Sequence, residues 1–324
     1  MLEIVVIAVL TGAVRSGTSV LYGTLGEIIS ERAGVVNLGV EGCMLMGACA
    51  GFVTTAITGD PLLGIAAAGL AGGALSLVHA FLCISRGANQ LASGLATMFF
   101  GLGLTGLIGA PYIKANIEGL NPWPVPFLAD LPYLGTILFR HDALTYASLL
   151  LALALWATLK FTRWGLAVRA VGERSTVAFA AGLHPRKIQY AAVVAGGVLA
   201  GLGGAQLSLA FTHTWVEGMT AGRGFIAVAL VIFSMWDPLK AILGAGLFGA
   251  AVAFQFQLQT LGTPISPYVL DMLPYLLTLA VLLIWGQTGR RAMPEGLRAV
   301  MAGGGQTSVG GVTIRPRTAG TPAG

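Results

Sequence analysis

Charged residues are scarce in this chain of 324 residues. Only 10% are Asp, Glu, Lys or Arg, whereas 56% are hydrophobic, and the mean hydropathy is +0.82. A soluble domain carries about 25% charged residues, so this sequence has too little polar surface to cover a fold in water. The shortage excludes a soluble globular protein and predicts an integral membrane protein.

Catalytic and metal-binding patterns are also missing. The three cysteines, Cys43, Cys49 and Cys83, and the four scattered histidines lack metal-ligand spacing. The sequence has no nucleophile elbow, phosphate-cradling G-x-x-x-x-G-K-[ST] loop, zinc motif or acid pair at catalytic spacing. We therefore expect no enzyme, no metal site and no cofactor in this chain. If ATP powers the protein, the ATPase must be a separate subunit.

The alternation of a membrane β-barrel is absent as well. The apolar runs are instead long enough for helices that cross the hydrocarbon, which needs about 20 residues. Glycine, with 47 residues, is common where membrane helices pack closely. We predict an all-α polytopic bundle with room for broken helices. With about 20 residues needed for each span, we expect about nine spans. They are residues 4–26, 34–57, 61–84, 88–110, 141–160, 188–211, 219–236, 239–258 and 268–286.

Basic residues predict the orientation. They gather between 160 and 187 and again after 290, so both regions should be cytoplasmic. This spread of charge explains the pI of 9.3 better than a nucleic-acid surface does, and we expect no nucleic-acid partner. No basic leader precedes the first apolar run, which we expect to be retained as a span.

The chain divides into a transmembrane domain, 1–291, and a tail, 292–324. The tail is rich in Gly, Thr and Pro and is expected to be disordered and cytoplasmic. The Pro-rich loop at 111–140 should lie outside. It either caps the mouth of a pathway or is a rigid connection with Trp123 and Tyr133 at the membrane interface.

Polar residues interrupt the apolar sequence between 25 and 51. Asn37 and Glu41 are four residues apart, so a helix would put them on one face, with Gly39 between them. An acid at mid-bilayer costs about 2.5–3.5 kcal/mol, so it should face the bundle interior or a wet cavity. Two hypotheses remain: a pathway-lining or gating element at a discontinuous helix, or an interhelical hydrogen bond.

Glu27, Glu31 and Arg32 precede the second expected span. Charges at membrane boundaries are usually solvated or paired. We therefore expect these three to form a solvated or ion-paired turn.

Further polar candidates flank other spans. Asn89 and Gln90 open the fourth span as helix caps or as cavity residues. Trp215, Glu217 and Arg223 lie on the expected outer side. An aromatic ring beside hydrogen-bonding groups suits a polar, ring-bearing substrate, although Trp is also an ordinary interfacial anchor.

A basic amphipathic stretch follows the fifth span, at about 161–187. Its sequence from 163 is RWGLAVRAVGERSTVAFAAGLHPRKIQY, with a helix-compatible run at 175–181 and a turn at Gly182 and Pro185. A short helix parallel to the membrane suits docking into a groove on a cytoplasmic partner. The alternative is a connector without a partner. Separately, AGGALSLVHA at 71–80 echoes AGGVLAGLGG at 195–204, a weak sign of an internal repeat.

Several stretches in one order carry a family resemblance: GEIISERAGVVNLGVEG, GANQLASGLATMFFGLGLTG, RAVGERSTVAFAAGLHPRKIQYAAVVAGGVLAGLGGAQLSLA and WVEGMTAGRGFIAVALVIFSMWDPLKAILGAGLFG. The chain resembles the permease subunits of bacterial ABC importers in the branched-chain amino acid, sugar and nucleoside superfamily, closest to the nucleoside or simple-sugar branch. The resemblance implies a type II ABC importer permease in the inner membrane. Its implied partners are a cytoplasmic ATPase, a second related permease and an extracytoplasmic substrate-binding lipoprotein.

The resemblance also implies roles for residues. The segment that contacts the ATPase would include Arg169, Gly172, Glu173, Ala178, Ala181 and Gly182. Asn37, Gly39 and Glu41 fall in the second-span signature near the pathway, whereas Met98 stands where many relatives carry Asn. The expected solute is a nucleoside, followed by a simple sugar or a branched-chain amino acid. The rival is a stand-alone secondary transporter, for which Glu41 is the plausible coupling carboxylate.

Overall fold

The computed structural model describes residues 2–301 and is almost entirely helical. Eight helical segments in this range are long and apolar enough to cross a membrane, which confirms the predicted all-α polytopic fold. The elements are α1 (Leu2–Arg32), α2 (Val40–Thr58), α3 (Pro61–Ala80) with the π-helical η1 (Phe81–Ser85), α4 (Gln90–Gly109), the 3-10 turn η2 (Ala110–Tyr112), β1 (Trp123–Pro124), α5 (Leu134–Leu138), β2 (Arg140–His141), α6 (Ala143–Phe161), α7 (Arg163–Glu173), α8 (Ser175–Ala180), α9 (Pro185–Ala205) with the π-helical η3 (Gln206–Phe211), α10 (Arg223–Ser234), α11 (Pro238–Thr260), α12 (Pro267–Asp271), α13 (Leu273–Ala292) and α14 (Glu295–Met301).

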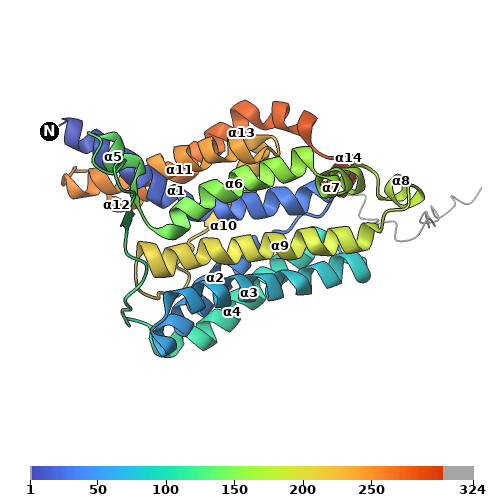
Figure 1. Ribbon diagram of the computed structural model, residues 1–324, viewed down its shortest axis with the longest axis horizontal. Helices are drawn as coiled ribbons and strands as arrows, with labels where there is room; N and C mark the ends of the chain where they lie inside the picture. The colour runs from blue at the N-terminus through green and yellow to red at the C-terminus, as the bar shows by residue number, and fades with distance from the viewer. Residues whose placement is uncertain (1, 302–324) are drawn as a thin grey trace, which may run out of the picture.

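The central helix of the bundle is α9. In Figure 1 it runs along the middle of the molecule, with α2, α3 and α4 on one side and α1, α6, α11 and α13 on the other. Glycines allow the close crossings: a Cβ on Gly204 of α9 would lie 1.8 Å from the Met44 carbonyl oxygen of α2. A Cβ on Gly72 of α3 would lie 2.3 Å from the Gly197 carbonyl oxygen of α9. The abundance of glycine is therefore a packing requirement at these crossings.

The direction of α9 follows from its contacts with α1. Gly26 of α1 faces Gly196, whereas Ser19, nearer the start of α1, faces Gly203. The numbering runs in opposite senses, so α1 and α9 are antiparallel.

The helix α11 is also antiparallel to α1, because Gly17 faces Ala245 and Gly12 faces Ala253. α9 and α11 therefore run in the same direction, and the chain between them must return across the bundle. The helix in this return is α10, with 12 residues, about 18 Å long at 1.5 Å per residue. That is short of the roughly 30 Å hydrocarbon core.

Residues 219–236, expected to be a full span, therefore hold a helix that is too short to cross the membrane. The outer part of the return, residues 212–222, is non-helical. Its turns use left-handed backbone at Gly218, Ala221 and Gly222, with φ of 68°, 47° and 78°, and such angles cannot continue a helix. The return from α9 to α11 therefore consists of a non-helical stretch followed by the short helix α10.

The two sequence stretches that echo each other occupy matching places in the fold. Residues 71–80 end α3 just before the π turn η1, and residues 195–204 lie near the end of α9 just before the π turn η3. The two helices pack against each other.

Opposite ends of the bundle carry different connections. α5, α12 and the N-terminal end of α1 lie at one end, and α7, α8 and α14 lie at the other (Figure 1). At the α5 end, β1 pairs antiparallel with β2, with Trp123 opposite His141. The loop before β1 bonds to the segment after α9, where Leu120 N donates to the Leu209 carbonyl oxygen at 2.8 Å. Trp123 and Tyr133 are exposed.

Candidate functional site

The second span is discontinuous at its start. α2 begins only at Val40, and the chain before it runs back along α1, because Asn37 N donates to Glu27 Oε1 at 2.6 Å. Glu27 lies five residues before the end of α1, about 7.5 Å deeper in the bundle. We call residues 33–39 the re-entrant segment. Asn37 is therefore not helical, and the assumption that it shares a helical face with Glu41 is wrong.

Side chains from three helices satisfy the backbone of the re-entrant segment. Gln90 at the start of α4 accepts from Val36 N at 2.9 Å, and the His79 Nε2 atom of α3 lies 3.0 Å from the Val36 carbonyl oxygen. At the start of α9, Gln189 donates to the Ala33 carbonyl oxygen at 3.2 Å. Non-helical backbone at membrane depth needs such internal partners. The Gln90 side chain therefore hydrogen-bonds the backbone of the re-entrant segment.

Asn37 also shapes the start of α2. Its side-chain oxygen accepts from Gly39 N at 2.9 Å, and Gly39 is the N-cap residue of α2. A Cβ on Gly39 would lie 3.0 Å from the Gly94 carbonyl oxygen of α4. Both residues act in the turn that starts the helix at this depth.

Glu41 joins α2 to the N-terminus of α10. Its Oε1 atom accepts from the Thr220 hydroxyl at 2.7 Å and from Gly222 N at 2.8 Å, and its Oε2 atom accepts from Gly224 N at 2.6 Å. Glu41 is only 8% exposed. The first amides of a helix have no helical partner and carry its positive dipole end, so a carboxylate is stabilised there.

A cavity of about 220 Å³ lies beside this junction. α2 and α4 supply side chains, and the non-helical segment before α10 supplies mainly backbone. Two helix N-termini, those of α2 and α10, therefore meet at a partly exposed cavity, since Leu102, Gly218 and Ala221 in its lining are exposed, and transport proteins with broken helices place their sites at such junctions. The lining residues are Glu41, Gly42, Leu45, Met98, Leu102, Gly218, Thr220, Ala221 and Gly222.

Glu27, Glu31 and Arg32 do not form the expected solvated turn. Glu27 and Glu31 are each 1% exposed. Glu31 Oε2 accepts from Trp236 Nε1 at 2.6 Å, and Arg32 donates to the Trp236 carbonyl oxygen at 3.1 Å. The expectation is wrong because α1 continues to Arg32 inside the bundle and the end of α10 folds against it.

Several sequence candidates do not line the cavity. Asn89 is an exposed N-cap that accepts from Ala92 N at 3.0 Å. Trp215 is fully buried against Gly109, and Glu217 is exposed. Arg223, the first residue of α10, lies 5.7 Å from the centre of the Phe211 ring.

Sequence analysis missed two features of this region. Arg15 of α1 donates to the Ala210 carbonyl oxygen at 2.8 Å and lies 5.3 Å from the Phe211 ring centre. Its charge inside an apolar span was a visible signal. The partners of Glu41 at Thr220, Gly222 and Gly224 carried no comparable signal. In residues 2–301, no group of His, Cys, Asp and Glu could hold a metal ion.

The basic stretch forms two short helices, α7 and α8. Gly182, with φ of +85°, ends the turn after α8. Ala178 is buried, whereas Val177 and Phe179 are 59% and 70% exposed. Ala181 is exposed too. α8 therefore presents two large apolar side chains outward.

In α7, the coupling candidates Gly172 and Glu173 contact other elements, whereas Arg169 bonds within its own helix. The Arg169 Nε atom donates to the Gly165 carbonyl oxygen at 3.4 Å. Gly172 packs so closely that a Cβ there would lie 2.1 Å from the Arg32 carbonyl oxygen. Glu173 accepts from Glu295 N at 3.0 Å.

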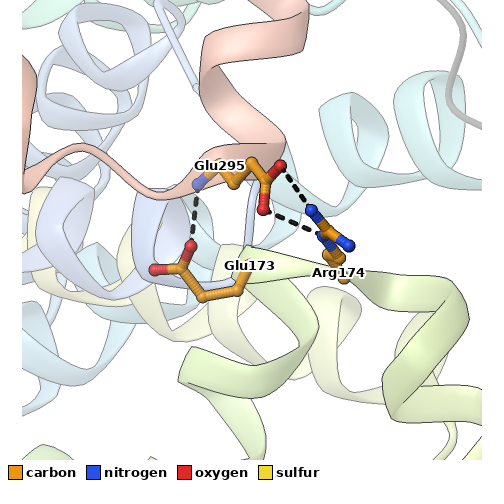
Figure 2. Close-up of polar contacts among 3 residues, drawn as sticks. All are labelled: Glu173, Arg174 and Glu295. Carbon is orange, nitrogen blue, oxygen red and sulfur yellow. Dashed lines mark hydrogen bonds and ion pairs between the residues drawn. The ribbon is translucent and has the colours of Figure 1, made fainter.

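The helix α14 corrects the expected tail. Residues 295–301 are helical, and Leu297 is fully buried in the main core, so this part of the tail is ordered by apolar packing. Figure 2 shows Arg174 paired with Glu295 through two contacts of 2.9 Å. Hydrogen bonding by Arg174 and its charge lower the pKa of Glu295. The rest of the expected tail, 302–324, lies outside the described residues.

Broken helices beside a cavity, among the eight apolar helices found in residues 2–301, are typical of a multi-span membrane transport protein. The model of the family described as branched-chain amino acid transport system / permease component matches residues 8–282. The chain therefore belongs to this ABC transporter permease family.

Curated relatives place the chain near sugar and nucleoside permeases. A putative glucose ABC transporter permease protein of Haloferax volcanii is 42% identical over 313 residues, covering 89% of this chain and 95% of the relative. A guanosine ABC transporter permease protein of Bacillus subtilis is 36% identical over 293 residues, covering 84% and 89%. A second guanosine permease protein of that organism is 25% identical over 244 residues, covering 73% and 70%. No solved structure matches the chain.

Proposed function

We propose that the protein forms one half of the membrane pathway of an ATP-driven importer, with a nucleoside as its solute. The meeting of two helix N-termini at the cavity beside the buried Glu41 carries the proposal, because transporters place solutes at such junctions. Apolar walls beside backbone groups suit an uncharged ring-bearing solute.

A simple sugar is the second candidate for the solute. The glucose permease relative at 42% identity favours it, whereas the guanosine permease relative favours a nucleoside. Both solutes are uncharged and carry several hydroxyl groups, so the cavity chemistry admits either.

The importer would need three further subunits: an ATPase, a second homologous permease and an extracytoplasmic substrate-binding lipoprotein. Two guanosine permease proteins of one organism resemble this chain, which supports pairing of homologous permeases. The exposed Val177 and Phe179 of α8 suit a groove on the ATPase. We place this end of the bundle, with the C-terminus, in the cytoplasm because the basic residues gather there.

Reconstitution tests the function. Proteoliposomes that hold both permeases and the ATPase, supplied with the binding protein, should take up labelled guanosine only with ATP. Labelled glucose in parallel vesicles decides between the two solutes. Uptake by this chain alone, driven by a proton or sodium gradient and indifferent to ATP, would overturn the proposal in favour of a secondary transporter.

A variant of Gly182 tests the role of α8. Gly182→Val forces a β-branched residue into left-handed backbone and should lower the solute imported per ATP hydrolysed. The control is Gly59→Val, which imposes the same strain at φ of +72° in the α2–α3 connection. If the two variants imported the same amount of solute per ATP hydrolysed, α8 would have no role in coupling.

A further inference from the structure

The C-terminal helix α14 is fastened to the junction of α7 and α8. Arg174, the residue between those helices, pairs with Glu295 through both carboxylate oxygens (Figure 2). Glu173, the last residue of α7, accepts from Glu295 N. Two neighbouring residues of the junction are therefore tied to one residue of α14. Such a two-point attachment fixes orientation as well as position.

Apolar burial supplies the adhesion of α14. The Leu297 side chain is fully buried and Met293 is 8% exposed, and both belong to the same core cluster as Ile29 of α1 and Val168 of α7. The ion pair is exposed, with Arg174 and Glu295 at 64% and 54%, so it adds little stability. Its two hydrogen bonds instead fix the orientation of the α7–α8 junction relative to α14.

Three backbone segments are stacked without side chains at this place. A Cβ on Gly296 of α14 would lie 2.6 Å from the Gly172 carbonyl oxygen of α7. On its other side, a Cβ on Gly172 would lie 2.1 Å from the Arg32 carbonyl oxygen and 3.3 Å from Gly34 N. The end of α7 thus lies between α14 and the start of the re-entrant segment, and close-packed backbone transmits displacement.

The re-entrant segment continues this contact to the cavity. It spans residues 33–39, is held by Glu27 and Gln90, and ends at the first turn of α2, where Glu41 lines the cavity. No flexible side chain intervenes between α14, α7 and the segment that leads to α2.

We propose that Arg174 and Glu295 are positioning residues: by fixing α14 to the α7–α8 junction, they hold Gly172 against the re-entrant segment, so that displacement of α8 reaches the cavity. The inference rests on the proposed function. The role proposed for α14 is mechanical, and α14 lies outside the coupling segment at about 161–187.

Charge reversal with a swap tests the pair in the reconstituted importer. Arg174→Glu and Glu295→Arg should each lower the solute imported per ATP hydrolysed by about 2-fold to 30-fold, the range for residues in a coupling network. The double variant Arg174→Glu/Glu295→Arg restores an ion pair and should return the ratio to near wild type. Arg86→Glu, an exposed residue between α3 and α4, is the matched control and should leave the ratio unchanged.

Two further measurements sharpen the result. Gly296→Ala should lower the same ratio without any change of charge, because its methyl group would push α14 away from Gly172. The distribution of distances between spin labels on α8 and at the start of α4 should broaden in each single variant. It should narrow again in the double variant, whether or not transport is observed.

The outcomes separate the two proposals. Single variants equal to wild type, or a double variant as impaired as the singles, would overturn the positioning role. A wild-type complex without ATP-driven uptake would count against the proposed function alone. The distance measurements would then decide the positioning role by themselves: unchanged distances in the single variants refute it.

Discussion

Glu41 offers the sharpest test of how the cavity is built. Its carboxylate accepts three hydrogen bonds from residues 220–224. Glu41→Ala removes the acceptor and leaves the Gly222 and Gly224 amides unpaired inside the bundle. Each unpaired amide costs about 1–3 kcal/mol, so the two together should lower the free energy of unfolding by about 2–6 kcal/mol.

Two milder variants grade the effect. Glu41→Gln keeps one oxygen for Thr220 and Gly222, but its NH₂ group would face Gly224 N, another donor, so about 1–3 kcal/mol should be lost. Thr220→Val removes only the hydroxyl bond and should cost about 0.5–1.5 kcal/mol. The expected order of destabilisation is therefore Glu41→Ala, then Glu41→Gln, then Thr220→Val.

Equilibrium unfolding in mixed detergent and SDS micelles measures these free energies. The control is Glu217→Gln, which changes an exposed acid that precedes the same segment and should be neutral. If Glu41→Gln were as stable as wild type, the three hydrogen bonds would not hold α10 against α2. A destabilised Glu217→Gln variant would show that the loss is not specific to this carboxylate.

Three other predictions follow from packing and pairing. Gly204→Ala should destabilise the bundle by about 1–3 kcal/mol through overpacking, because its Cβ would lie 1.8 Å from a carbonyl oxygen; Gly246→Ala, which has open space, is its control in the same micelle assay. Trp236→Phe removes the donor to Glu31 Oε2 and should destabilise by about 1–3 kcal/mol; an unchanged midpoint would contradict the bond. The pKa of Glu295 is lowered by Arg174, so the ion pair is fully formed above the ordinary carboxyl pKa, about 4.3. It is lost as the pH falls through the lowered pKa. A spin label on α14 should therefore gain mobility only at pH values near or below that lowered pKa.

The spans were predictable because hydrophobicity over about 20 residues is a local property. The break in the second span was harder to place. The run from Val35 to Gly39 holds two β-branched residues and ends in glycine, and both features disfavour a helix. They argue for a break, but the reversal of the chain depends on Glu27, Gln90 and His79, which come from other parts of the sequence.

Burial of the charged end of α1 was not predictable from local sequence. Glu31 meets Trp236 across a separation of 205 residues, and nothing near Glu31 in the chain signals that partner. The ordered α14 was missed for a similar reason. A Gly-rich composition dominates the expected tail, whereas the order of its first part depends on Leu297 entering a core formed by α1 and α7.

The pathway and packing hypotheses for Glu41 describe one arrangement. Its hydrogen bonds hold residues 220–224 against α2, and the backbone of residues 218–222 lines the cavity. Any widening of the cavity on that side requires these residues to leave α2, which breaks the three bonds. In the proposed importer the bonds would favour the narrow form of the cavity, so a ligand or an ATP-driven displacement of α8 would have to favour an open form by more than their net strength. On the proposal made above, the hydrogen bonds of Glu41 would resist opening of the pathway, and the re-entrant segment would be the contact through which α7 acts on the cavity.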